Sequence, residues 1–188
     1  MKNRIKIMSL ILCLLAGFGP EIQAQVSKEV RFAKALYRQV SRARERGRLF
    51  ESISELNKGG LRIPRVGTFN RIERYFYRLT PEKKPTLKTI LVKIERNNVR
   101  YNQEFLFNDA GEPIYVFESQ NDFKKFKYRI LRVYFHKDKL IQWVKGRAVI
   151  DGQFLQEKHK KRARYLLSEA KKYYQKYKVQ VAGIEQME

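Results

Sequence analysis

The sequence predicts an α+β fold with an N-terminal helix, an antiparallel β-meander of about six strands, and a C-terminal helix packed on the sheet. Three observations support this. Apolar and polar residues alternate from about Arg71 to Lys145, with turn residues between the runs. Apolar residues at helical spacing precede and follow this region. Within it, Val99–Phe107 and Ile114–Glu118 flank Asn108–Glu112, whose Gly111 suits a hairpin turn that needs positive φ.

The first 24 residues have the three parts of a secretory signal peptide. Basic residues precede the apolar run Ile7–Leu15, which is shorter than the roughly 20 residues that a membrane-spanning helix needs. Glycine and proline follow, and Ile22-Gln23-Ala24 offers a cleavage site. We therefore expect residues 1–24 to be a signal peptide and residues 25–188 to form a single basic α+β domain, exported to the periplasm or the exterior, with no transmembrane segment after cleavage.

Two alternatives concern the same segment. It could act as a short membrane anchor, although the helix breakers after the apolar run disfavour this. It could also carry a lipid on Cys13, although the Leu10-Ile11-Leu12 that precedes this residue differs from the small residues of a lipoprotein signal. Cys13 is the single cysteine of the chain, so cleavage after Ala24 would exclude disulfides, zinc–thiolate sites and a cysteine nucleophile.

The segment Val26–Asn57 is predicted to be helical. Apolar residues at alternating steps of four and three form its stripe: Val26, Val30, Ala33, Tyr37 and Val40. Gly47 divides the segment, and a second short stripe follows at Leu49, Phe50, Ile53 and Leu56. Four arginines at steps of two, Arg42, Arg44, Arg46 and Arg48, point to opposite sides of a helix, so we expect a solvated surface and not one patch.

The meander follows an extended connector at Leu61–Asn70. Its predicted strands lie at 72–79, 90–94, Val99–Phe107, Ile114–Glu118, Lys127–Phe135 and Leu140–Lys145. The predicted turns are Thr80–Pro85, Asn97-Asn98, Asn108–Glu112, Ser119–Lys125 and His136–Lys139. Several strands are apolar on both faces, which indicates a sheet covered by helices on one side and partly shielded, or facing a partner, on the other.

A closing helix is predicted at Gln153–Tyr177, with a tail, Val179–Glu188, that can fray. The complete layout is similar in shape to cystatin-like folds, in which a curved antiparallel sheet grips a helix. Such a likeness implies no function.

No motif for catalysis, metal binding or nucleotide binding stands out. The aspartates fall in predicted turns, where Asp has a local hydrogen-bonding role. The histidines are His136, in a turn, and His159, whose protonation neighbouring cations disfavour. Neither has a partner at catalytic or zinc-ligand spacing. We therefore predict a protein without catalytic residues, cofactor or metal. A hydrolase with an unconventional site is an alternative to this prediction.

The net charge of +22 attracts anionic partners. We predict an exported binding or accessory protein that engages an envelope surface, a glycan, a lipid headgroup or an acidic protein. Aromatic and basic residues interleave at Arg74–Arg78 and Lys127–Arg129, but export disfavours nucleic acid. The candidate anion-binding residues are Lys158, Lys160, Lys161, Arg162, Arg164, Arg129 and Arg74. The alternative is a structural or protein-interaction module, dimeric or not, whose charge only makes it soluble.

Overall fold

The structure, a computed structural model, describes residues 19–65 and 67–185. Most of the predicted signal peptide, residues 1–18, lies outside the described residues. The described part of that segment, from Gly19, begins helix α2, which runs from Gly19 to Glu45. The sheet follows, and helix α3, Glu157–Glu185, closes the chain after a short 3₁₀ turn, η1, at Gly152–Phe154.

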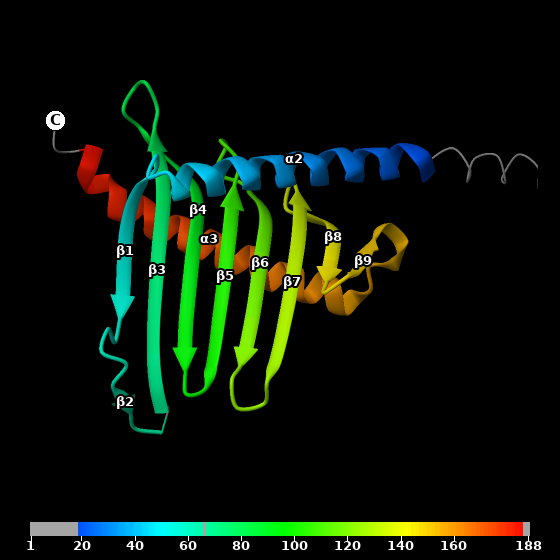
Figure 1. The fold of residues 1–188 in the computed structure, drawn as a ribbon. Helices are drawn as coiled ribbons and strands as arrows, with labels where there is room; N and C mark the ends of the chain where they lie inside the picture. The colour runs from blue at the N-terminus through cyan, green and yellow to red at the C-terminus, as the bar shows by residue number, and fades with distance from the viewer. Residues whose placement is uncertain (1–18, 66, 186–188) are drawn as a thin grey trace, which may run out of the picture.

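Nine antiparallel strands form the sheet (Figure 1). Their bounds are β1 Phe50–Leu56, β2 Arg62–Ile63, β3 Gly67–Leu79, β4 Pro85–Arg96, β5 Val99–Phe107, β6 Pro113–Asp122, β7 Lys127–His136, β8 Lys139–Lys145 and β9 Ala148–Asp151. From β3 to β9 each strand pairs with the next in sequence, while β1 and β2 both pair with β3. The predicted α+β meander is confirmed, but the count of about six is too small because β1, β2 and β9 were not predicted.

One helix lies on each face of the sheet, so the expected placement of the helices on one side is wrong. Helix α3 packs on one face through Ala163, Leu166, Ala170, Tyr173 and Tyr177, against a core of strand residues that includes Tyr75, Ile90, Phe105 and Val133. Helix α2 packs on the other face through Val30, Ala33 and Val40, against Leu106, Ile114, Tyr115 and Tyr134. Because residues that alternate along a strand point to opposite faces, strands apolar on both faces are buried on both.

The helices cover only one half of the sheet. On β5 the buried core residues are Phe105, Leu106 and Phe107, at the end of the strand, whereas Val99–Gln103 lies beyond both cores. Figure 1 shows α2 crossing the strands at the end opposite the β4–β5 and β6–β7 hairpins. The hairpin half of the sheet therefore projects past both helices, and its side chains are available on two faces.

Three predicted boundaries are wrong. The first helix ends at Glu45 and not at Asn57, because Gly47 adopts φ 63° and the following residues pair with β3 as strand β1. The predicted loop Ser119–Lys125 begins as strand, since β6 continues to Asp122 against β5 and β7. Helix α3 continues past Tyr177 to Glu185, where a frayed tail was predicted.

Helix α3 begins with a reciprocal cap. The backbone N–H of Gln156 donates to His159 Nδ1 at 3.1 Å, while the N–H of His159 donates to the Gln156 carbonyl at 2.9 Å. His159 is buried beside the Trp143 ring. Burial, followed by the charge of Lys158, holds the pKa of His159 below its usual value. The predicted effect of neighbouring cations is thus confirmed, although burial contributes more.

Candidate functional site

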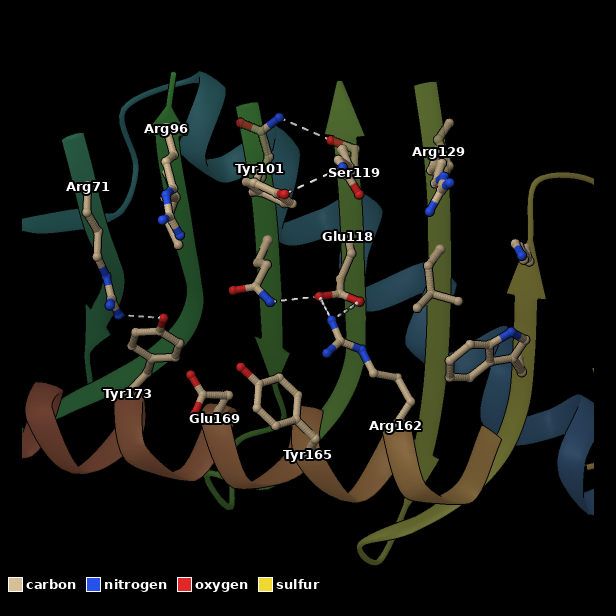
Figure 2. A pocket seen from close by; sticks show the side chains of 18 of the residues that line it. Arg71, Arg96, Tyr101, Glu118, Ser119, Arg129, Arg162, Tyr165, Glu169 and Tyr173 are labelled. Atoms are coloured by element: carbon tan, nitrogen blue, oxygen red, sulfur yellow. Dashed lines mark hydrogen bonds and ion pairs between the residues drawn. The ribbon is translucent and has the colours of Figure 1, made fainter. Parts of the chain in front are cut away.

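A large concave site lies between the α3 side of the sheet and one flank of α3. It is a groove with a volume of about 640 Å³, a size typical of small-molecule sites. Figure 2 shows Arg162, Tyr165, Glu169 and Tyr173 rising from α3, while Arg96, Tyr101 and Arg129 lie further along the strands, away from the helix. We refer to this site as the α3 groove.

Strand register builds the α3 groove from rows of residues that face one another across neighbouring strands. The row nearest the core is apolar: Tyr75, Ile90, Phe105, Val116, Val133 and Trp143. Two residues further along each strand the row is mixed: Glu73, Val92, Gln103, Glu118, Leu131 and Lys145. The next row is Arg71, Ile94, Tyr101, Gln120 and Arg129. The sheet therefore changes from apolar to cationic and aromatic over about 13 Å.

Two cations of the groove are held by carboxylates. Arg162 of α3 donates to both carboxylate oxygens of Glu118, at 2.7 and 3.0 Å, and Gln103 donates to the same group at 2.7 Å. Arg71 pairs with the buried Glu73 at 2.7 Å and donates to the Tyr173 hydroxyl at 2.7 Å. The Nε of Arg71 is also buried, without a hydrogen-bond partner in the described part of the chain. These pairs fix the helix against the sheet and leave one guanidinium N–H unsatisfied.

Three further cations have no such partner. Arg96, Arg129 and Lys145 all line the groove. Within residues 19–65 and 67–185, their side chains form no ion pair, side-chain hydrogen bond or ring contact. Counting its lining residues, the groove has five cations and two carboxylates, Glu118 and Glu169. Uncompensated positive charge beside a concave surface attracts anions, and Arg can bind a carboxylate or phosphate through two hydrogen bonds.

Five aromatic side chains line the groove, beside the aliphatic Ile94, Ile130 and Leu131. The aromatic residues are Phe69, Tyr101, Trp143, Tyr165 and Tyr173. Tyr165 is about half exposed, and the Arg162 guanidinium lies 4.7 Å from its ring centre. Burial raises the pKa of Tyr173 to about 12, so its hydroxyl stays a hydrogen-bond donor throughout the neutral range. The groove can therefore offer charge, hydrogen bonds and ring surfaces to one ligand.

The structure separates the predicted anion-binding residues. Arg162 and Arg129 line the α3 groove. Arg74 lies on the opposite face, paired with Glu51 and 5.2 Å from the Phe76 ring. Arg164 pairs with Glu157 at 2.5 Å on the surface of α3, and Lys158, Lys160 and Lys161 are exposed outside the groove lining. The seven residues do not form one site.

Sequence reasoning missed Arg71, Arg96 and Lys145. They come from β3, β4 and β8, and only the register of strands far apart in the sequence brings them together. One signal was present for two of them. Arg96 continues the alternate positions of Ile90, Val92 and Ile94, and Lys145 follows Trp143 at the same step of two.

A second cationic depression lies at the end of α2. Its lining contains five arginines, Arg38, Arg42, Arg46, Arg48 and Arg78, with alanine and glutamine between them. The fourth arginine of the predicted solvated series, Arg44, points the other way, to Glu104 at 2.8 Å. The prediction that the four arginines form no single patch is therefore confirmed. Arg42, Arg46 and Arg48 nevertheless line the same depression as Arg38 and Arg78. This depression lacks the aromatic lining of the α3 groove.

The described residues contain neither a metal-ion cluster nor a membrane-spanning helix. No group of three or more His, Cys, Asp or Glu side chains is placed there to hold a metal ion. Neither described helix has the length and hydropathy needed to cross a bilayer. The chain matches no protein-family model, no curated protein and no solved structure.

Proposed function

We propose that the chain is an exported, non-catalytic protein that binds an anionic ligand in the α3 groove. The observation that carries this proposal is the set of three cations, Arg96, Arg129 and Lys145, that line a concave site without a carboxylate partner among the described residues. Export is proposed from the signal-peptide pattern of residues 1–24 alone.

The lining favours a ligand that combines acidic groups with rings. Guanidinium groups suit carboxylate, sulfate or phosphate, and exposed aromatic faces suit the flat, apolar faces of sugar rings or other cyclic groups. The volume of about 640 Å³ suits a ligand of a few rings. An acidic oligosaccharide meets these requirements better than a simple inorganic anion, because the latter would leave the aromatic surface uncovered.

Intrinsic fluorescence provides a direct test, because Trp143 is the single tryptophan and lines the groove. An oligogalacturonate should change the emission and bind with a measurable Kd, whereas a neutral oligosaccharide of equal length should not. Replacing Arg96, Arg129 and Lys145 together by glutamine should weaken binding by at least about tenfold, since each hydrogen bond to a charged group contributes about 1.5–3 kcal/mol. Calorimetry at two salt concentrations measures the Kd of the parent chain and of the triple variant independently.

A matched control separates a site from general charge. Replacing Lys158, Lys160 and Lys161 by glutamine removes the same charge from exposed positions outside the groove. If binding is specific to the groove, this variant should keep a Kd within about twofold of the parent at moderate salt. Equal loss in both triple variants, or no binding of any acidic saccharide, would contradict the proposal.

The edge strand β1 favours a second candidate, a protein-interaction module. β1 is the first strand of the sheet order, and its Phe50, Ile53 and Leu56 side chains are each more than half exposed. A strand whose outer edge is unpaired and that exposes apolar side chains can pair with a strand of another chain. Under this alternative, Ile53→Lys would abolish association with the partner, while the groove variant would retain it.

A further inference from the structure

The hairpin that joins β6 to β7 ends in an exposed cluster of aromatic and cationic side chains. We refer to residues 123–128 as the hairpin tip; they are Phe123, Lys124, Lys125, Phe126, Lys127 and Tyr128. The exposed fractions of the three rings are 47%, 94% and 62%, in chain order. The tip contains no acidic residue, and the nearest one, Asp122, accepts a hydrogen bond from the backbone N–H of Lys125 at 3.1 Å.

Local packing does not account for these rings. Phe126 adopts φ 50° at the turn, a backbone conformation that bulky residues rarely adopt. Its ring is almost fully exposed to water. Phe123 is about half exposed, and the Arg100 guanidinium lies 5.3 Å from its ring centre. A phenylalanine that gains nothing in the fold is a candidate for burial against something outside it.

The tip is placed to reach an extended surface. It lies at the end of the sheet that projects past both helices, beside the β4–β5 turn, since the N–H of Phe123 donates to the Asn98 carbonyl at 3.0 Å (Figure 1). The convex shape of the tip favours one type of partner over another. A projecting ring on a convex turn is buried by a medium that it can enter, whereas stacking on bases uses rings that lie flat along a groove.

From the rings, the lysines and their projection we propose that the hairpin tip docks on an anionic lipid bilayer, with Phe126 in the interface and Lys124, Lys125 and Lys127 at the headgroups. Aromatic side chains concentrate at this depth of a bilayer, and each basic residue near an anionic leaflet adds to the attraction. The inference stands apart from ligand binding in the α3 groove, because it uses none of the groove residues.

Vesicle sedimentation with the full chain tests the inference. The chain should bind vesicles of phosphatidylcholine with about one third phosphatidylglycerol, and pure phosphatidylcholine at least about tenfold more weakly. Phe126→Ser should reduce the partition coefficient by about tenfold, the effect of removing one inserted ring. The tryptophan of Phe126→Trp should shift its emission to shorter wavelength when the anionic vesicles are added, and the parent chain with the same vesicles gives the contribution of Trp143 to be subtracted.

Two controls match these variants. Phe154→Ser removes a ring that is 68% exposed at η1, far along the chain from the tip, and should leave binding within about twofold. Replacing Lys124, Lys125 and Lys127 by glutamine should weaken binding much more than replacing Lys158, Lys160 and Lys161. Circular dichroism should show every variant folded, since all these side chains are exposed.

Three results would overturn the inference. The first is equal weakening by the two lysine variants, which would reduce the effect to net charge. The second is the absence of binding to anionic vesicles. The third is an unshifted Phe126→Trp emission combined with tip-dependent binding of a single-stranded oligonucleotide, which would assign the rings to base stacking.

Discussion

Two buried glutamates lie on opposite faces of the sheet, and each connects it to a helix. Glu104 on β5 accepts hydrogen bonds from Arg44 at 2.8 Å and from the Tyr37 hydroxyl at 3.2 Å, both on α2. Glu73 on β3 pairs with Lys176 of α3 at 3.2 Å and accepts a hydrogen bond from Tyr75. A buried carboxylate is tolerated only when it is paired, so each glutamate specifies where its helix docks.

The contrast between Arg44 and Arg42 tests this role at one residue. Arg44→Gln should lower the free energy of unfolding by about 2 kcal/mol or more, because it leaves the Glu104 charge buried without its cationic partner. Arg42→Gln removes an exposed arginine from the same turns of α2 and should change stability by no more than about 0.5 kcal/mol. Urea unfolding measures both values, and equal effects would show that Glu104 does not depend on Arg44.

At the scale of elements, the loop between β5 and β6 sets how closely α3 can approach the sheet. Gly111 has φ 77°, as its place in the predicted turn requires, and its backbone lies against the Tyr174 hydroxyl. The Tyr174 ring in turn packs on Phe107, with ring centres 5.5 Å apart. The helix is therefore held by the loop as well as by the strands, and a side chain at position 111 would push it away.

Two glycine substitutions separate backbone strain from this close approach. Gly146→Ala, at φ 60° with no atom within 4 Å of an added Cβ, should cost about 1 kcal/mol from the left-handed conformation alone. Gly111→Ala should cost at least about 2–3 kcal/mol, because the added methyl group also overlaps Tyr174. Thermal unfolding of the two variants gives the difference. Similar losses of stability in the two variants would mean that α3 or Tyr174 moves away from the methyl group at little cost in free energy.

At the scale of the whole molecule, local patterns predicted the middle of the chain better than its edges. β5 has the predicted bounds, Val99–Phe107, because alternation and a tight turn are both local signals. β1 was predicted as helix, since the spacing of Leu49, Phe50, Ile53 and Leu56 fits a helical stripe, and only pairing with β3 makes the segment a strand. Spacing alone contains no information about that partner.

The candidate site shows the same limit. Arg162 and Arg129 were predicted because each lies in a basic or basic–aromatic run. The groove that joins them depends on cross-strand register, on the length by which the strands exceed α3, and on which carboxylates neutralise which cations. These properties are non-local, so the sequence predicted the charge but not its arrangement.

Buried tyrosines give the whole fold a predicted alkaline limit. Burial is the main cause that raises the pKa of Tyr75, Tyr115 and Tyr134, and it raises that of Tyr173 to about 12. A raised pKa in the folded state means that these hydroxyls add stability fully below about pH 10, the value of an unfolded tyrosine, and that this stability is lost as the pH rises towards 12.

The urea midpoint should therefore fall between about pH 9 and pH 11.5, and absorbance at about 295 nm should show the buried tyrosines ionising together with unfolding, after the exposed ones. Lysine opposes this trend, because loss of ammonium charge near pH 10.4 relieves repulsion in a chain of net charge +22. A midpoint that stays constant or rises over this range would show that charge repulsion, and not tyrosine burial, governs alkaline stability. Repeating the titration in about 1 M NaCl, which screens the repulsion, should leave the fall in place if burial is the cause.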